Sequence, residues 1–395
     1  MHPELLRAVS ALGFKRPTPI QTDAIPAARE GRDVLACAQT GSGKTAAFLL
    51  PILERVRSKS RGVTRALILT PTRELALQIE EHRRQLSRHT RITGGVAIGG
   101  VGMTPQEQSF RRGVDVLIAT PGRLLDHFQY PYARLAGLEV LVLDEADRML
   151  DMGFLPDIRR VLRHLPATAR QTMLFSATMP APILELADEL LTVPARINIG
   201  PRSAPPAEVA QALYPVPSKL KVELLVELLR RDEIGNVIVF CRTKHRANRV
   251  AEKLERQGMS TARIHGRRSQ APRTEALAGF KDGTYRVLVA TDIVARGIDI
   301  ESLDHVLNFD VPAAPDDYIH RVGRTGRAGT AGDAFTFVAP EEEGDIRDIE
   351  RKLGRRLERR TVRGFDYNAP VQERLEIPVR ASARVRPVTR RFRRG

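Results

Sequence analysis

Tryptophan is absent from this chain, and cysteine and aromatic residues are scarce. The two cysteines, Cys37 and Cys241, lie far apart, and each is inside an apolar run typical of a buried strand. We therefore expect two reduced thiols rather than a disulfide, and no His/Cys spacing resembles a zinc site. Aromatic residues make up 5% of the chain, which argues against recognition of nucleobases on a broad aromatic surface.

Long apolar runs are also missing. No stretch approaches the length of a membrane span, and Met1–Arg7 lacks the basic and apolar blocks of a secretory signal. We expect a cytoplasmic protein without a membrane partner. With 395 residues, 42% hydrophobic and 28% charged, the chain is long enough for two domains with ordinary cores.

The charge is unevenly distributed. The formal net charge is +16, and residues 355–395 contain 13 arginines but only four acidic residues, so this end alone contributes +9. Its apolar residues are sparse, and we expect most of it to be disordered. A basic arm favours a polyanionic partner, although charge alone is equally compatible with a solubilising tail.

The order of apolar and helical stretches indicates two α/β units. Met1–Leu12 has helical spacing, and the prolines of Gly13–Gln21 predict a rigid, non-helical segment after it. Near-continuous apolar runs then alternate with helical stretches, which is typical of a parallel sheet covered on both faces. The predicted strands of the first unit are Val34–Cys37, Ala66–Leu69, Val114–Ala119, Val140–Leu143 and Thr172–Phe175.

A cluster of prolines around Gly200 and Ser203 interrupts this pattern and predicts a linker. The alternation then restarts. We predict domains at 1–200 and 208–354, a linker at 201–207 and a basic tail at 355–395. The predicted strands of the second unit are Val237–Cys241, Ala262–His265, Arg286–Ala290, His305–Phe309 and Ala334–Val338, and a charged helical stretch, Glu341–Leu353, follows.

A glycine loop, Ala38–Thr45, stands between an apolar strand and an Ala/Leu-rich helix. Its glycines allow backbone N–H groups to point at an anion, and the helix N-terminus adds to this positive potential. Lys44 can bind outer phosphates and the Thr45 hydroxyl can ligate Mg²⁺. The general phosphate-loop pattern begins with glycine where this chain has Ala38, and alone the loop is also compatible with an ordinary strand-to-helix turn.

Two adjacent acids, Asp144 and Glu145, follow the apolar strand Val140–Leu143. Asp144 suits Mg²⁺, usually through water, and Glu145 could hold an attacking water. Taken alone, an acid pair at a strand end is more often a helix N-cap. The glycine loop about a hundred residues upstream favours the catalytic interpretation.

From about Gly13 to Gly329 the chain resembles the DEAD-box ATP-dependent RNA helicases of superfamily 2. The motifs occur in family order, which is far more specific than any one of them. They are Gly13–Gln21, Ala38–Thr45, Pro71–Ala76, Gly99–Gly100, Thr120–Arg123, Asp144–Asp147, Ser176–Thr178, Val237–Thr243, Ala290–Asp299 and His320–Arg327. The segment from Ile349 to Tyr367 resembles the bacterial RhlE-like branch.

The resemblance implies ATP and Mg²⁺ as cofactors and assigns roles in the nucleotide site. Phe14 would stack on the adenine and Gln21 would read its edge, which suits an aromatic face and an amide. Arg324 and Arg327 would reach across from the second domain to the γ-phosphate, as an arginine finger does. The remaining implied contacts are to phosphate through Thr40, Gly41, Ser42, Gly43, Lys44 and Thr45, and to the ribose through Gly297 and Asp299.

Other residues would connect the domains or bind RNA. The implied interdomain residues are Asp147, Ser176, Thr178, His320 and Arg321. Hydroxyls, free N–H groups and arginines suit phosphate oxygens, so RNA binding would be largely independent of sequence, and contacts to the 2′-OH would favour RNA over DNA. The implied RNA contacts are Pro71, Thr72, Arg73, Gly100, Thr120, Gly122, Arg123, Arg242, Thr243, Gly266, Gln270, Arg273, Thr291 and Asp292.

This chain departs from the family in two places. The family usually carries an aromatic residue well upstream of Gly13, and this chain begins too late to include one. Either the start is truncated or the support for the nucleotide comes from elsewhere. Arg267 stands where the family often has an acid, which adds positive charge near the RNA path.

The sequence thus predicts two tandem RecA-like parallel-sheet domains that unwind or remodel short RNA duplexes and RNA–protein complexes by RNA-stimulated ATP hydrolysis. Single-stranded RNA and short duplexes are the expected partners, with a ribonuclease or a ribosome-assembly factor left open. Two other classes remain: a DNA-directed helicase with the same core, and a non-catalytic RNA-binding protein whose ATP site only acts as a latch.

Overall fold

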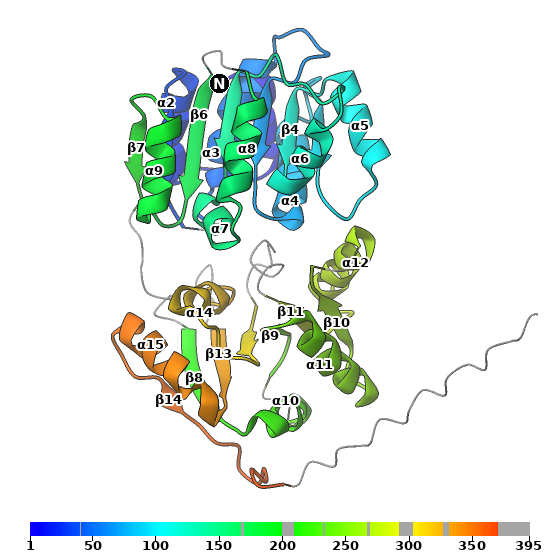
Figure 1. Cartoon of the computed structure of the whole chain (residues 1–395), viewed down its shortest axis with the longest axis vertical. Coiled ribbons are helices and arrows are strands. Elements are labelled where there is room, and N and C mark those ends of the chain that lie inside the picture. Colours follow the sequence, from blue (N-terminus) through cyan, green and yellow to red (C-terminus); the bar gives the residue numbers. More distant parts are fainter. Residues whose placement is uncertain are drawn as a thin grey trace, which may run out of the picture.

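The computed structural model describes residues 1–39, 41–166, 170–199, 209–231, 234–266, 269–291, 303–326 and 332–369. It consists of two α/β domains stacked one above the other, each built on a seven-stranded parallel sheet (Figure 1). The expected pair of RecA-like domains is confirmed. The predicted linker falls within residues 200–208, outside the described residues.

The first sheet has the strand order β3-β4-β2-β5-β6-β1-β7. Each predicted run of the first unit matches one of its strands to within two residues at either end, whereas β3 and β7 were not predicted. The strands are β1 Val34–Cys37, β2 Ala66–Leu69, β3 Gly94–Ala97, β4 Val116–Ala119, β5 Val140–Leu143, β6 Gln171–Ser176 and β7 Ala195–Asn198. The helices are α1 Pro3–Ala11, α2 Pro19–Arg29, α3 Lys44–Val56, α4 Arg73–Leu86, α5 Met103–Arg112, α6 Pro121–Phe128, α7 Ala146–Asp151, α8 Leu155–His164 and α9 Ala181–Leu190.

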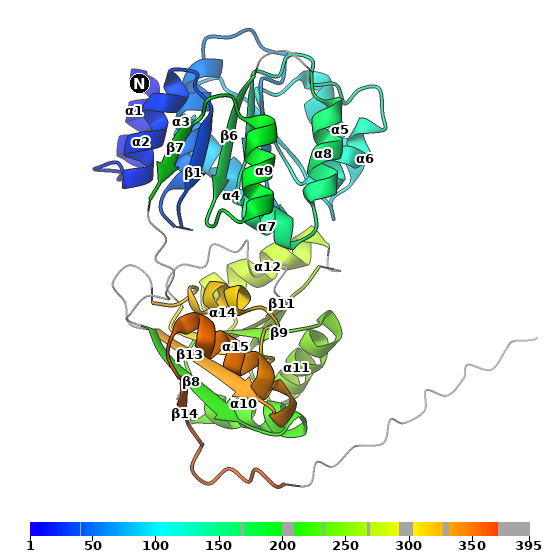
Figure 2. The same ribbon diagram turned by 60° about the vertical axis from the view of Figure 1, so that its left-hand side comes forward.

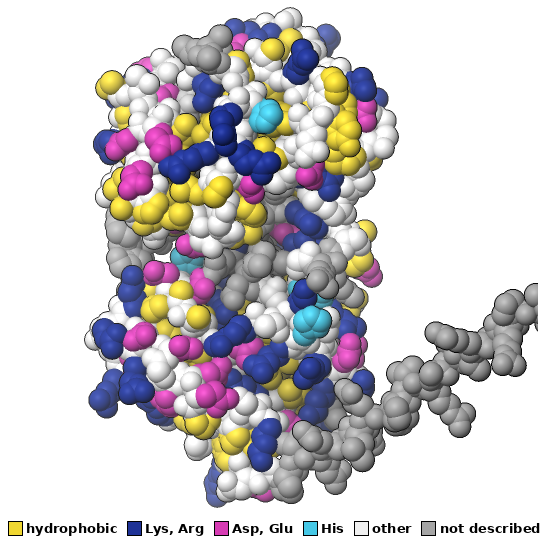
Figure 3. Space-filling model, in the orientation of Figure 1, with side chains coloured by type: hydrophobic (Ala, Val, Ile, Leu, Met, Phe, Trp, Pro, Cys, Tyr) yellow, Lys and Arg dark blue, Asp and Glu magenta, His cyan; other side chains and the backbone are white. Residues whose placement is uncertain are grey.

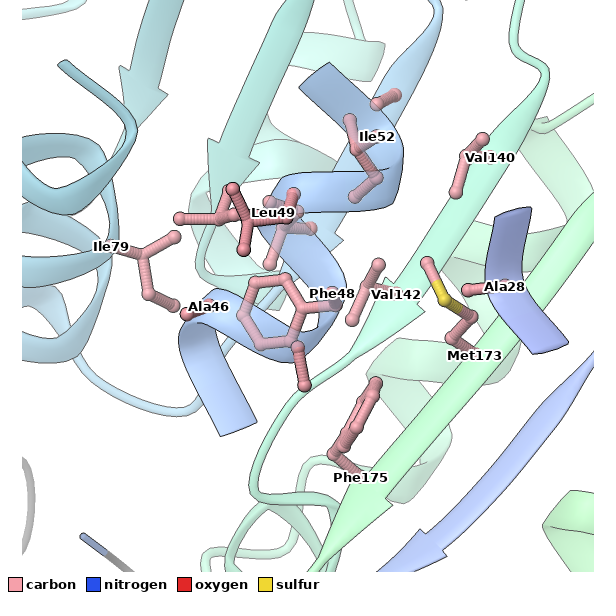
Figure 4. Close-up of a cluster of buried hydrophobic side chains, with 14 of the residues drawn as sticks. Ala28, Ala46, Phe48, Leu49, Ile52, Ile79, Val140, Val142, Met173 and Phe175 are labelled. Carbon is pink, nitrogen blue, oxygen red and sulfur yellow. The ribbon is translucent and has the colours of Figure 1, made fainter. Parts of the chain in front are cut away.

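Alternation along the buried strands gives the first domain a core on each face of the sheet. Val140 and Val142 of β5 pack in one core with α1 to α4, while Leu141 and Leu143 point into the other with α5 to α9. In the first core, side chains of α3 lie against β5 and β6 (Figure 4). The rings of Phe48 and Phe175 meet there at 5.4 Å between centroids. Burial on both faces explains why these strands are apolar throughout.

The second sheet has the order β10-β11-β9-β12-β13-β8-β14. Its strands are β8 Val209–Pro215, β9 Val237–Cys241, β10 Thr261–Ile264, β11 Val287–Thr291, β12 His305–Asn308, β13 Gly332–Val338 and β14 Glu358–Arg359. Its helices are α10 Lys221–Arg230, α11 Lys244–Arg256, α12 Gln270–Lys281, α14 Pro315–Val322 and α15 Glu343–Leu353, with short 3₁₀ turns at Ser218–Leu220 and Pro340–Glu342. Figure 2 shows α12 and α14 on the side of this domain that faces the first.

One expectation needs correction: Gly13–Gln21 is not wholly non-helical, because α2 begins at Pro19, a position where proline suits a helix start. The described structure continues past residue 354, where β14 pairs with β8, and Leu357 and Val362 are buried in the second domain. The few apolar residues of this segment suffice because they dock onto an existing core. Residues 370–395 lie outside the described part.

Cys37 and Cys241 both lie in the described part of the chain and are not joined in a disulfide. None of the helices in the described ranges is long and apolar enough to cross a membrane.

Candidate active site and domain interface

The glycine loop and the acid pair come together because β1, β6 and β5 are neighbours in the first sheet. All three strands are parallel, so their carboxyl ends lie at one edge. The loop after β1, the acids after β5 and Ser176 at the end of β6 therefore share this edge. Ligands of open α/β sheets bind in such a position.

The glycine loop has the backbone that an anion site requires. Gly41 and Gly43 have φ values of 82° and 94°, in the left-handed region that favours glycine. A Cβ on Gly43 would lie 2.5 Å from the Gln21 side chain. Lys44 is buried and donates a 2.6 Å hydrogen bond to the Ala38 carbonyl. Because Lys44 binds the main-chain carbonyl of residue 38, the side chain at this position takes no part in the contact, and alanine is tolerated there in place of glycine.

Gln21 joins the segment before α2 to the glycine loop. Its Oε1 accepts a bond from the Thr18 N–H at 3.0 Å, and its Nε2 donates to the Gly43 carbonyl at 3.1 Å. An amide has a second N–H and a second lone pair, which remain for a base edge. Phe14 is half exposed, as a stacking surface must be. Thr40, Gly297 and Asp299 lie outside the described residues.

Asp144 is 2% exposed, and burial raises the pKa of its carboxyl to about 7; the positive charge of Lys44 opposes this shift, while Glu145 and Asp147 add to it. Its Oδ1 accepts a bond from the Glu145 N–H at 3.0 Å. No residue in the described ranges donates to Oδ2. A buried carboxylate with one unused oxygen, at the same sheet edge as the Thr45 hydroxyl at the start of α3, is a donor set that fits Mg²⁺.

Glu145 has an unusual backbone. Its φ of 52° and ψ of 53° place a non-glycine residue in the left-handed region at the start of α7. Arg148 holds its side chain, because Nη1 donates to Oε2 at 2.7 Å within a largely buried pair. Strain of this kind persists only where the surroundings fix it, and it concentrates at functional sites.

Asp147 organises the segment after β6. Its Oδ2 accepts bonds from the N–H groups of Ala177 and Thr178 and from the Thr178 hydroxyl, at 2.8 to 3.1 Å. Its own N–H donates to Ser176 Oγ at 3.1 Å. Asp147, Ser176 and Thr178 were predicted to link the domains. The described bonds lie inside the first domain, where they tie the acid motif to the end of β6.

In the second domain, His320, Arg321 and Arg324 lie on and just after α14, which faces the first domain (Figure 1). Arg321 is 2% exposed, donates to Asn308 Oδ1 and the Asp310 carbonyl, and lies over the Phe240 ring. These contacts are within the second domain and hold α14 on its sheet. Arg324 is also buried. Arg327 lies outside the described residues.

The predicted RNA contacts gather along half of each sheet. Pro71–Arg73, Gly100 and Thr120–Arg123 follow β2, β3 and β4, which are adjacent, and the residues of the second half follow β9, β10 and β11, also adjacent. Thr72, Thr120 and Thr243 are the N-cap residues of α4, α6 and α11. The first N–H groups of a helix have no partner within the helix, so these three helix N-termini provide anion-binding positions. Asp292 lies outside the described residues.

Two arginines of this track shape the loop after β3. Arg123 donates to the Val101 carbonyl at 2.9 Å. Arg73 lies against the glycine pair so closely that a Cβ on Gly100 would come 2.1 Å from its Nη1. A side chain on either glycine would displace the Arg73 guanidinium from this position. Figure 3 shows basic and acidic side chains intermingled on the face in view, so positive charge is not a continuous stripe there.

A buried ion pair joins the domains beside this track. Glu74 of α4 accepts a 2.7 Å bond from Arg273 Nη2 of α12, and the Gln270 amide lies 3.4 Å from its other oxygen. The side chains of Arg273 and Glu74 are only 4% and 2% exposed. Gln270 and Arg273 were predicted as RNA contacts. The structure gives them an additional role at the domain interface.

A phosphate loop, an acid pair and an arginine-bearing helix on a facing domain define a two-domain nucleotide-dependent helicase. Two family models match the chain: DEAD/DEAH box helicase over residues 18–186 and helicase conserved C-terminal domain over residues 220–329. The chain belongs to the DEAD-box family of ATP-dependent RNA helicases, which are RNA-dependent ATPases.

Curated relatives agree. The DEAD-box ATP-dependent RNA helicase CshA of Bacillus cereus (strain ATCC 10987 / NRS 248) is 42% identical over 371 residues, which cover 94% of this chain and 70% of CshA. CshA of Geobacillus kaustophilus is 42% identical over 374 residues, or 95% of this chain and 80% of that protein. The RhlE-like branch stays a prediction.

Solved structures agree as well. Dbp5 of S. cerevisiae bound to RNA and ADP BeF3 matches with a TM-score of 0.82 and 32% identity, over 91% of this chain and 94% of Dbp5. Mss116 bound to ssRNA and UDP-BeF matches with a TM-score of 0.82 and 28% identity, over 94% of this chain and 79% of Mss116.

Sequence reasoning missed Glu74 and Arg148. Glu74 stands inside a quoted motif, but no local pattern shows a partner 199 residues away. Arg148 had a signal, because an acid and a base at i and i+3 of a helix can pair.

Proposed function

We propose that this helicase separates short RNA duplexes locally, by closing its domains around ATP and one RNA strand and reopening after hydrolysis. The observation that carries this proposal is the relative placement of the domains. One and the same variant of S. cerevisiae Dbp5 matches this chain with a TM-score of 0.82 when bound to RNA and ADP BeF3, and 0.71 when bound to Gle1 and IP6. Coverage is nearly equal, so we attribute the difference mainly to domain arrangement. The present arrangement is more similar to that of the RNA- and nucleotide-bound form than to that of the other.

In this closed arrangement, residues of both domains would act on one phosphate. Water attacks the γ-phosphorus while the bond to the bridging oxygen of ADP breaks. Glu145 holds that water and accepts a hydrogen bond from it; Lys44, Arg324 and Arg327 stabilise the charge on the transferring group. Thr45 and Asp144 would hold Mg²⁺, which neutralises phosphate charge when bound.

RNA would be bound through its backbone. The N-terminal N–H groups of α4, α6 and α11 would take phosphates, which makes binding largely independent of sequence. ATP and RNA favour the same closed state, so each increases the affinity for the other. Hydrolysis removes one of the two ligands, and the RNA strand is released.

The arginine-rich tail is proposed to tether RNA by counterion release. Its described part, residues 355–369, begins with β14 at the edge of the second sheet and continues to the end of the second domain remote from the first (Figure 1). The tail would therefore hold RNA away from the domain interface. A cytoplasmic location and a ribonuclease or ribosome-assembly partner stay predictions.

The test is ATP hydrolysis with no nucleic acid, with single-stranded RNA, duplex RNA and DNA of matched sequence, together with strand separation of short and long RNA duplexes. We expect stimulation by RNA well above that by DNA, and separation that falls steeply with duplex length. Hydrolysis indifferent to RNA, or equal rates on short and long duplexes, would overturn the proposal. Lys44→Ala supplies the inactive control. A latch that only binds ATP would give no turnover with any nucleic acid.

A further inference from the structure

Arg148 is the fourth residue after Asp144 and the third residue of α7, and it takes no part in the chemistry described so far. It is 4% exposed. Its Nη1 donates to Glu145 Oε2 at 2.7 Å, across one helical turn. Within the described residues, its Nε and Nη2 have no hydrogen-bond partner. An arginine side chain has five N–H donors, so most of the hydrogen-bonding capacity of Arg148 is unused within the described residues.

Stability does not explain such a pair. Desolvating two charges costs about as much as their attraction returns, and a well-packed apolar side chain would serve the fold at least as well. Two unpaired nitrogens make the balance worse. The arginine therefore points to a need for orientation, since a guanidinium binds a carboxylate in a defined plane.

The carboxylate that it holds has little other support. Glu145 has a left-handed backbone, and its main-chain N–H is bound to Asp144. No other described residue donates to its carboxylate, and the side chain keeps 11% exposure. A glutamate has three side-chain torsions, so without Arg148 the carboxylate could adopt several positions.

We propose that Arg148 is a positioning residue of the ATPase site, which fixes Glu145 by Oε2 and so presents Oε1 to the attacking water. This inference rests on the proposed role of Glu145. A misplacement of about 1 Å in a catalytic group can cost on the order of 100-fold in rate. The loss should appear in kcat, because neither Arg148 nor Glu145 is needed to bind ATP itself.

The test is a double-mutant cycle with Arg148→Met, Glu145→Gln and the double variant, measured in the full chain with saturating single-stranded RNA. We expect Arg148→Met to lower kcat about 10- to 100-fold with KM for ATP within about twofold. In the Glu145→Gln background the same change should have little further effect, by single-turnover measurement. Arg148→Lys should lie between Arg148→Met and the unsubstituted chain. Arg160→Gln removes an exposed arginine that pairs with Asp157 at the same i,i+3 spacing and should leave kcat unchanged.

The possible failures are distinct. Normal turnover by Glu145→Gln would overturn the proposed role of Glu145. Impaired Glu145→Gln together with normal kcat in Arg148→Met would overturn only the role of Arg148. Equal losses in both backgrounds, or a rise in KM that accounts for the loss, would show a merely structural arginine. Should Arg148→Met not fold, Arg148→Lys decides: the proposal requires a kcat at least about threefold lower at unchanged KM, because an ammonium lacks the planar fork.

Discussion

The buried pair between Glu74 and Arg273 leads to a prediction about domain closure. The substitution Glu74→Gln keeps the shape of the side chain but removes its charge. Arg273 would then be left as a buried cation facing a neutral amide. Removing one member of a buried pair typically costs about 3 to 5 kcal/mol, and every 1.4 kcal/mol is about tenfold in an equilibrium constant.

The cost should fall on closure rather than on the stability of either domain. The two residues come from α4 and α12 of different domains, and Arg273 can regain water when the domains separate. We therefore take the lower end of the range and expect closure to be disfavoured by about 100-fold. RNA affinity in the presence of a non-hydrolysable ATP analogue should weaken by a similar factor. Affinity without nucleotide should change little.

Fluorescence anisotropy with a labelled single-stranded RNA measures both affinities. Glu81→Gln is the matched control, because Glu81 lies on the same helix but is exposed and pairs with Arg84. The sign of the effect discriminates between two roles of Arg273. If Arg273 served RNA alone, removal of Glu74 would free it and leave RNA affinity unchanged or tighter, and that result would exclude a role of the ion pair in domain closure.

Three further predictions concern the glycine loop, the basic tail and a buried histidine. Gly43→Ala combines a φ of 94° with a Cβ placed 2.5 Å from the Gln21 amide, and we expect ATP binding to be at least about tenfold weaker by titration. The control Gly153→Ala has a φ of 75° but open space around its Cβ and should bind ATP normally. Equal ATP affinities of the two variants would contradict this prediction. Deletion of residues 355–395 removes the buried side chains of Leu357 and Val362, each of which stabilises the fold by about 1.5 to 3 kcal/mol, so Tm should fall by at least about 5 °C. Deletion of 370–395 should leave Tm unchanged while reducing the salt dependence of RNA binding. Equal Tm values for the two deletions would show that β14 contributes nothing to stability. His127 is fully buried between Tyr132 and Gln106, and burial lowers its pKa. Below about pH 6.5 the unfolded chain therefore gains a proton that the folded chain does not. The stability of the fold should decline between about pH 6.5 and the lower pKa of His127 in the folded chain. His127→Gln should decline less over this window in thermal melts, and parallel curves would exclude the histidine as the cause.

Most of the candidate site could be predicted from the sequence because its residues lie in short, contiguous segments. A glycine loop after an apolar strand is typical of a phosphate-binding loop when an acid pair follows another strand of the same parallel sheet. Parallel strands then bring both to one edge without further information. The strands β1, β2, β5 and β9, buried throughout except at Cys37, were predicted with their bounds, since burial on both faces leaves continuous apolar runs.

The elements that escaped prediction carry weaker local signals. Strand β3 contains two glycines, and β14 has only two residues, both exposed. They are strands because a neighbouring strand offers them hydrogen bonds. The described segment after residue 354 follows a similar rule. Its isolated apolar residues stabilise the fold only because they are buried against a core formed by the rest of the second domain.

What the sequence alone determined is therefore the chemistry: which phosphate-binding loop, which acids and which arginines the chain possesses. The tertiary structure decided their assignments. It buried Arg321 inside one domain, gave Glu145 a left-handed backbone and an arginine partner, and paired Glu74 with a residue 199 positions away. Local pattern arises from interactions within a few residues, whereas charge pairing between distant segments depends on which surfaces the two sheets present to each other once folded.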